Sequence, residues 1–255
     1  MDVSNAYNKI QEQLKKHPES IAVLEHEIDI ALQIQYFKES KAIKKELDSQ
    51  EVLSSKDLLF ENDLTLEQKR KLLSKLASVN DVEAYRTIEK YLNHSSESLK
   101  EWTILAYQES KMLMESSLLD QAPLFISTGL GGKGKKLRYF IVVITRDKRP
   151  LSELHQSIIR SEFEFGFSGQ GAELENVDFY GYMATITGVV PLSVGLKDLL
   201  AGIVKQCNEL GDFLSPSFMV TNVKKMSFEE IEKAILEYEE KNCNNSRVDE
   251  NGSEN

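Results

Sequence analysis

Glycine is missing from the first 128 residues of this chain, and all 13 glycines lie at Gly129 or beyond it. Proline follows the same division, because Pro18 is the only proline before Pro123. Strands joined by tight turns depend on these two residues, so a long stretch without glycine favours helices. We therefore expect an α+β protein with a helical array over residues 1–120 and an α+β domain over residues 121–241. The polar residues 242–255 are expected to form a disordered acidic tail.

Apolar residues in the first part recur every three or four positions, which is the spacing of one helix face. Between positions 24 and 47 they are Leu24, Ile28, Ala31, Leu32, Tyr36, Ile43 and Leu47. Further along, Thr65 and Gln68 match a capping box, and Asp81 is placed to cap the next helix. A third helix carries Trp102 and ends near Ser116. Short loops between such helices predict antiparallel neighbours.

One part of this helical pattern resembles a known repeat family. The motif residues are Asn80 to Tyr85, Ile88, Tyr91, Leu92, Leu99 to Trp102 and Ala106. Together, within the segment from Thr65 to Ser116, they resemble a HEAT-like helical repeat. The resemblance implies paired helices that stack and present an extended surface to a protein partner.

From Pro123 the chain changes to apolar runs separated by glycine. Two apolar runs flank the sequence GLGGKGKK, and Phe140–Ile144 has the β-branched composition of a buried strand. We expect a β-hairpin whose glycine-rich and lysine-rich tip is exposed to solvent.

The rest of the second part alternates between helical and strand patterns. A helix is expected after Pro150, a strand over Val177–Val190, a helix capped by Ser193, and a short strand over Ser217–Val223. Ser227 begins a capping box before the last helix. The order β-β-α-β-α-β-α predicts a two-layer α+β domain with a four-stranded sheet and helices on one face.

The expected hairpin is basic, although the whole chain carries a net charge of −10. The segment from Pro123 to Arg146 has five Lys or Arg residues and no Asp or Glu. The candidate macromolecule-binding residues are Gly131, Gly132, Lys133, Gly134, Lys135, Lys136 and Arg138. Three interpretations stay open: a solubilising tip, a surface for an RNA phosphate or an acidic protein face, and an internal partner such as Glu237, Glu239 and Glu240.

The same segment matches the phosphate-loop spacing G-x-x-x-x-G-K from Gly129 to Lys135. That motif needs a serine or threonine next and a helix after it. Here Lys136 follows, and the next segment has a strand pattern. We therefore expect no bound nucleotide and assign no cofactor.

No catalytic or metal-binding constellation stands out. The four histidines, His17, His26, His94 and His155, are scattered and lack ligand spacing. Cys207 lies on the apolar face of a predicted helix, where packing explains it. A dense group of aromatic residues is expected to be core, with some lining a groove beside Gly166–Gly171. Its members are Phe163, Phe165, Phe167, Phe179, Tyr180 and Tyr182.

The start of the chain lacks the basic and apolar regions of a secretory signal, and no apolar run reaches the roughly 18 residues of a membrane span. We therefore expect a cytoplasmic protein with no membrane contact. The function expected from sequence is a non-catalytic adaptor or regulatory protein with a protein partner, using the helical array and the basic hairpin. Two alternatives remain: an RNA- or ribosome-associated factor using the same hairpin, and an enzyme with a site near residues 166–171.

Overall fold

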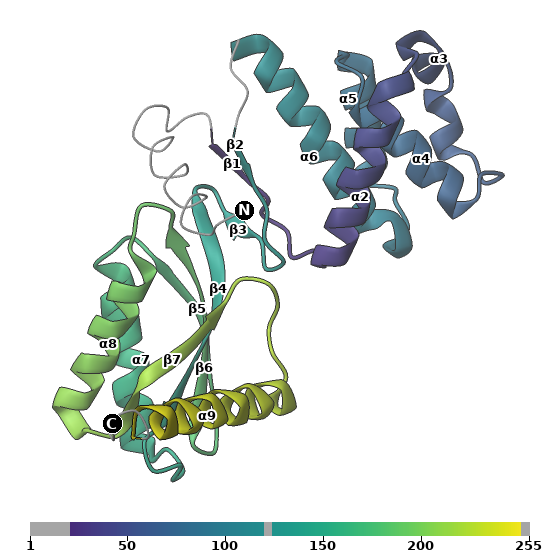
Figure 1. The fold of residues 1–255 in the computed structure, drawn as a ribbon. Helices are drawn as coiled ribbons and strands as arrows, with labels where there is room; N and C mark the ends of the chain where they lie inside the picture. The colour runs from purple at the N-terminus through teal and green to yellow at the C-terminus, as the bar shows by residue number, and fades with distance from the viewer. Residues whose placement is uncertain (1–20, 120–123, 251–255) are drawn as a thin grey trace.

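The computed structural model describes residues 21–119 and 124–250 and has a mixed α+β fold (Figure 1). Helices dominate the first part, and an antiparallel sheet flanked by helices forms the second. The expected boundary after residue 120 and the first 20 residues lie outside the described ranges.

Residues 21–119 contain a short strand, five α-helices and two 3-10 helices. They are β1 (Ile21–Val23), α2 (Ile30–Ile43), η2 (Lys44–Glu46), α3 (Ser49–Ser54), η3 (Lys56–Phe60), α4 (Leu66–Ala77), α5 (Val82–Leu92) and α6 (Glu97–Leu119). The expected caps are confirmed: Thr65 and Gln68 form a capping box, and the Asp81 side chain accepts a hydrogen bond from the Glu83 amide. Trp102 and Tyr36 are buried at the centre of this part, with their rings edge to face.

A largely buried carboxylate, Glu109, links α2 to α6. Glu109 accepts hydrogen bonds from the Tyr36 hydroxyl and the Ser40 hydroxyl, each at 2.6 Å. Lys44 adds an ion pair at 2.6 Å. Burial, followed by the nearby negative charge of Glu109, raises the pKa of Tyr36 well above its ordinary value, so Tyr36 stays protonated and donates.

The second part is built on a five-stranded sheet. Its strands are β3 (Gly132–Lys133), β4 (Lys136–Thr145), β5 (Glu173–Tyr180), β6 (Met183–Pro191) and β7 (Leu214–Thr221). Antiparallel pairs β5–β6, β6–β4 and β4–β7 place β5 and β7 at the two edges. In the central register Ile141 lies opposite both Ile186 and Val220. The order β4-α7-β5-β6-α8-β7 is the ferredoxin-like arrangement.

The single strand expected over Val177–Val190 is wrong, because this segment is a hairpin. Tyr180 pairs with Met183 across a two-residue turn, and Gly181 supplies the positive φ of 56° that the turn requires. The alternation of side chains continues through the turn, so the sequence pattern concealed it. The strand expected at Ser217–Val223 is present as β7, shifted towards the N-terminus.

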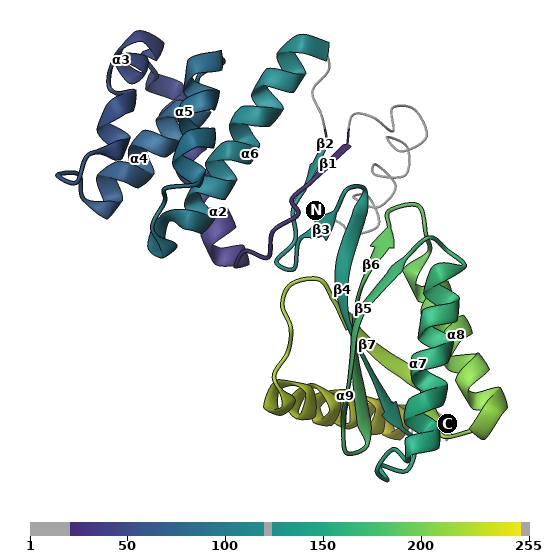
Figure 2. The same ribbon diagram turned by 180° about the vertical axis from the view of Figure 1, so that it is seen from behind.

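Helices cover both faces of the sheet, which corrects the expected two-layer arrangement. Helices α7 (Glu153–Ser168) and α8 (Leu196–Gly211) pack on one face, where Ile141, Val143 and Ile186 are buried (Figures 1 and 2). The opposite face carries Phe140 and Val142, and α9 (Phe228–Glu250) packs against it. The domain therefore has three layers.

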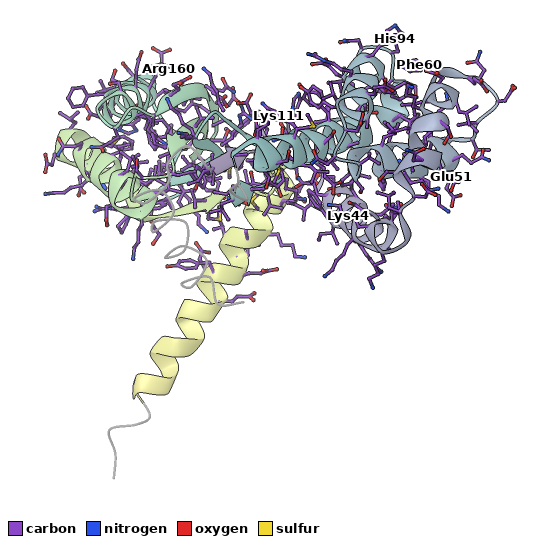
Figure 3. All side chains as sticks on the ribbon, turned by 90° about the horizontal axis from the view of Figure 1, so that it is seen from above. Lys44, Glu51, Phe60, His94, Lys111 and Arg160 are labelled. Atoms are coloured by element: carbon purple, nitrogen blue, oxygen red, sulfur yellow. The ribbon has the colours of Figure 1, made fainter. Side chains whose placement is uncertain are left out.

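The helix ends agree only partly with the expected ones. Ser152 caps α7, but α8 begins after Gly195 without a side-chain cap, not at Ser193. The capping box of Ser227 at the start of α9 is confirmed. Helix α9 continues to Glu250, where a disordered tail was expected from residue 242. Figure 3 shows α9 extending away from the body of the domain, so only its first turns cover the sheet.

The first apolar run of the expected hairpin has a different partner. β2 (Leu124–Ile126) pairs in parallel with β1, so Ile21 lies opposite Leu124. The hairpin itself is the short β3–β4 pair, which turns at Gly134 and Lys135. β1 and β2 thus join the start of the chain to the segment that enters the sheet (Figure 1).

Three backbone segments meet closely at the glycines that follow β2. A Cβ atom on Gly129 would lie 1.7 Å from the Val223 carbonyl oxygen, and one on Gly131 would lie 2.5 Å from the His26 carbonyl oxygen. A Cβ atom on Gly132 would lie 2.1 Å from the Lys136 carbonyl oxygen. We call residues 129–132 the glycine junction. Its glycines are required for the close approach of the protein's own backbone.

The junction is also joined by backbone hydrogen bonds. The Leu130 amide donates to the Asn222 carbonyl at 3.0 Å, and the Gly132 amide donates to the Glu25 carbonyl at 3.3 Å. The segment before α2, the hairpin and the loop after β7 are therefore held at one place.

We predict that Gly131→Ala destabilises the protein by at least about 2 kcal/mol, because φ is +67° there and the methyl group would meet backbone carbonyls. Urea denaturation checks this value. Gly202→Ala is the control, since it lies in α8 with open space around it and should gain about 0.5–1 kcal/mol. Equal stability of Gly131→Ala and the parent protein would contradict the packed junction.

Candidate functional site

The basic residues singled out by sequence lie in a hairpin that contacts the rest of the protein. Gly131 and Gly132 belong to the glycine junction. Gly134 has φ of +58° in the turn, and its amide donates to the Glu25 carboxylate at 2.8 Å. The Lys135 carbonyl accepts a hydrogen bond from the Leu192 amide at 3.1 Å.

The basic side chains of the hairpin form ion pairs with β5. Lys133 and Lys136 contact the two oxygens of Glu173 at 2.6 and 2.7 Å. Arg138 donates two hydrogen bonds to Glu175, at 2.6 and 2.8 Å, and a third to the Leu130 carbonyl. The tip residues Lys133, Gly134 and Lys135 are exposed, as expected, but Lys133 and the neighbouring Lys136 and Arg138 are paired with carboxylates of β5. The expected role of these residues in binding a macromolecule stays a prediction.

The ion pairs change the acidity of Glu173. Hydrogen bonds from Lys133 and then Lys136 lower the pKa of this carboxyl to about 2. Glu173 therefore stays ionised in the folded protein through the range where an ordinary glutamate becomes protonated.

The segment 166–171, considered above as an enzyme site, lies at the end of α7 and in the turn after it. A groove of about 470 Å³ is present between α7 and α8. A Cβ atom on Gly166 would lie 2.5 Å from the Ile203 side chain, so this glycine is explained by helix packing. Burial raises the pKa of the nearby Cys207 thiol to about 12, which keeps it protonated and unreactive at neutral pH.

A different cavity has the polar groups of a binding site. It has a volume of about 400 Å³ and lies on the sheet face that α9 only partly covers. Its floor is formed by β4 and β6, one wall by β5, and the other wall by the β7–α9 loop and the first turn of α9. We call it the sheet-face cavity. Its volume is within the range of small-molecule sites, about 300–1,000 Å³.

The floor of the sheet-face cavity offers two hydroxyl groups. Thr185 and Thr187 point to the same face because they are two residues apart on β6. Both are more than nine-tenths buried. Within the described part of the chain, neither hydroxyl has a hydrogen-bond partner. Thr185 and Thr187 line the cavity, so their hydroxyls are available to donate to or accept from a ligand atom placed there.

The β5 wall is polar and partly prearranged. The Asn176 amide donates to the Asp178 carboxylate at 2.5 Å, which fixes both side chains and leaves acceptor capacity on Asp178. Glu175 is held by Arg138. Lys225, on the opposite wall, forms an ion pair with Glu27 at 3.4 Å.

Two exposed aromatic rings stand at the cavity. Tyr180, on β5, is 48% exposed, and Phe228, at the start of α9, is 51% exposed. The expectation that the aromatic group is core holds for Phe163 and Phe167 but not for Tyr180, and Phe165, which is 78% exposed, lines the groove beside Gly166 and Gly169, as expected for part of the group. Asp178 and Tyr180 lie on the same face of β5 because they are two residues apart in a continuous stretch of pairing with β6.

In the described residues, no group of three or more His, Cys, Asp or Glu side chains is arranged to hold a metal ion. No described helix has the length and hydropathy that crossing a membrane requires.

No family model matches the chain, and no curated protein matches its sequence. Among solved structures, a putative transposase from Deinococcus radiodurans R1 is similar, with 16% identity and a TM-score of 0.35 over 42% of this chain and 93% of that chain. A REP-associated tyrosine transposase bound to a REP hairpin is also similar, with 13% identity and a TM-score of 0.31 over 36% of this chain and 59% of that chain. Such identities and TM-scores assign no activity to this chain.

The structure corrects the adaptor function expected from sequence. Lys133, Lys136 and Arg138, on which the adaptor function depended, are paired within the protein with Glu173 and Glu175. The adaptor interpretation is therefore withdrawn, and the HEAT-like resemblance of residues 65–116 stays a prediction.

We predict that Glu173→Gln reduces the loss of stability in acid. The lowered pKa of Glu173 stabilises the folded state above the ordinary glutamate pKa of 4.5, and this contribution disappears as the pH falls towards about 2. Urea midpoints measured across that pH range should therefore fall less in the variant than in the parent protein. Glu164→Gln, on the exposed side of α7, serves as the control. Parallel curves for Glu173→Gln and the parent would show that the ion pairs do not form.

Proposed function

We propose that this protein binds a small planar ligand of the nucleobase or nucleoside class in the sheet-face cavity. The observation that carries the proposal is the combination of two exposed rings, Tyr180 and Phe228, with a floor of two unpartnered hydroxyls. Flat aromatic ligands stack on such rings, and each stacked base contributes about 1–3 kcal/mol. The hydroxyls supply the hydrogen bonds that fix orientation.

The β5 wall favours a particular subset of bases. Asp178 keeps free acceptor capacity after its bond with Asn176. Carboxylates accept hydrogen bonds from exocyclic amino groups, as on cytosine N4. Bases that carry an amino group should therefore bind more tightly than uracil or thymine.

Charge favours an uncharged ligand over a phosphate-bearing one. Asp178 is at the cavity wall, and the cation opposite, Lys225, is engaged with Glu27. The chain as a whole carries a net charge of −10, which repels polyanions. A single-stranded DNA oligonucleotide presents the same bases, but it should bind no more tightly than the nucleoside.

The test is saturation-transfer NMR and calorimetry with adenosine, cytidine, guanosine and uridine. The double variant Tyr180→Ala, Phe228→Ala should weaken binding of the amino-bearing nucleosides by about 5-fold or more, since two stacking rings are lost. Both side chains are about half exposed, so the variant should keep the fold. Phe165→Ala is the matched control, because Phe165 is exposed on α7, away from the cavity.

Absence of saturation transfer from all four nucleosides would overturn the proposal, as would equal binding by the double variant and the parent. A single-stranded DNA oligonucleotide tested in parallel shows whether the protein prefers a free nucleoside or a base within a nucleic acid. If it binds far more tightly than the nucleoside, and its affinity falls steeply with salt, phosphate contacts dominate and the small-ligand assignment is wrong.

A further inference from the structure

The two edges of the sheet are protected very differently. The β5 edge carries Glu173, Glu175 and Asp178, together with a register shift after Leu174. Acidic residues and irregular pairing are the usual means of preventing another strand from adding to an edge. The β5 edge is therefore closed to other strands.

The β7 edge has no charged residue between Leu214 and Thr221. In the described chain β7 pairs with β4 alone, so its outer side is an open edge. Pro216, Ser217 and Val220 are exposed along it. Although the chain carries a net charge of −10, this uncharged edge places no charge of its own against a second copy.

An apolar groove runs beside this edge. It has a volume of about 600 Å³ and lies between the start of α8 and α9. Leu200 and Phe218 line it from the α8 side of the sheet, and Met219 and Ile235 line it from the α9 side. A strand added along β7 would place its side chains in this groove.

The sequence of β7 is chemically symmetric about one residue. Around Met219 it reads Ser-Phe-Met-Val-Thr. An apolar residue therefore lies on each side of Met219, and a hydroxyl residue lies next to each apolar one. In an antiparallel pair of identical strands centred at Met219, Phe218 faces Val220 of the second copy, and Ser217 faces Thr221 of the second copy. Aromatic residues opposite β-branched residues, and hydroxyls opposite hydroxyls, are favourable cross-strand pairs. Pro216, which has no amide hydrogen, ends the ladder.

We propose that two copies of this chain associate through β7, in antiparallel pairing about a two-fold axis at Met219. The two sheets then form one continuous sheet, and the apolar groove of each copy is covered by the other. Such an interface is isologous, because the same patch is used by both copies. The proposal is independent of the ligand in the sheet-face cavity, whose residues lie on β5, β6 and the start of α9.

Sedimentation velocity over a wide range of protein concentration tests the proposal. The parent protein should sediment with twice the mass of one chain at high concentration. Val220→Lys should weaken the dimer at least about tenfold, because it buries two lysines in an apolar interface. Val220 is 41% exposed, so the single chain should tolerate the change. Leu210→Lys, at an exposed position at the end of α8, is the matched control and should leave the dimer intact.

Cross-linking gives a second measurement that depends on the register. Residues at the axis of an antiparallel pair have Cα atoms about 4.5–5.5 Å apart, which suits a disulfide. In a Cys243→Ser background, Met219→Cys should therefore form a disulfide-linked dimer on oxidation, whereas Ser215→Cys, four residues from the axis, should not. A monomer at every concentration without cross-linking would overturn the proposal. So would a monomer that takes up an extended apolar peptide along β7, or a dimer that survives Val220→Lys.

Discussion

The arrangement of this protein depends on a place where three stretches of backbone touch with no side chain between them. At Gly129, Gly131 and Gly132 the chain lies against the carbonyl groups of Val223, His26 and Lys136. Each contact is too short for any residue with a Cβ atom. The contacts join the segment before the first helices to the first strand of the sheet and to the loop that leads into α9. The position of α9 over the sheet, and with it the wall of the sheet-face cavity, follows from this junction.

The same junction explains why a phosphate-loop spacing occurs without a phosphate loop. Glycines allow close approach of backbone to any group, and the sequence alone does not say whether that group is a ligand or the protein itself. Here the neighbouring groups are carbonyl oxygens, which repel phosphate. The positive charges of Lys133 and Lys136 pair with the carboxylate of Glu173 on β5, and Arg138 pairs with the carboxylate of Glu175.

Local signals in the sequence predicted local structure well. The absence of glycine predicted the helical part, and Thr65, Asp81 and Ser227 marked helix starts, because a cap is a hydrogen bond over two or three residues. Pairing between distant segments could not be predicted in this way. β1 and β2 are about one hundred residues apart in the chain, and the turn at Gly181 is hidden within an unbroken alternation.

The candidate site could not be predicted from the sequence, for the same reason. Its residues come from β4, β5, β6 and the segment that begins α9, and only the fold brings them together. Tyr180 was noticed as one of a group of aromatic residues expected to be core, but its exposure depends on which face of the sheet α9 leaves open, and only the fold shows this. The basic hairpin was noticed because its charges are consecutive, whereas its acidic partners lie 37 to 40 residues later.

Amide hydrogen exchange at the glycine junction tests the central claim most directly. The amides of Leu130 and Gly132 donate to the carbonyls of Asn222 and Glu25, so they should exchange slowly, as the central amides of β4 do. The Gly134 amide, which donates to an exposed carboxylate, should exchange faster. Exchange of Leu130 and Gly132 at the rate of an unprotected peptide would contradict the account, because it would make this segment a mobile tip.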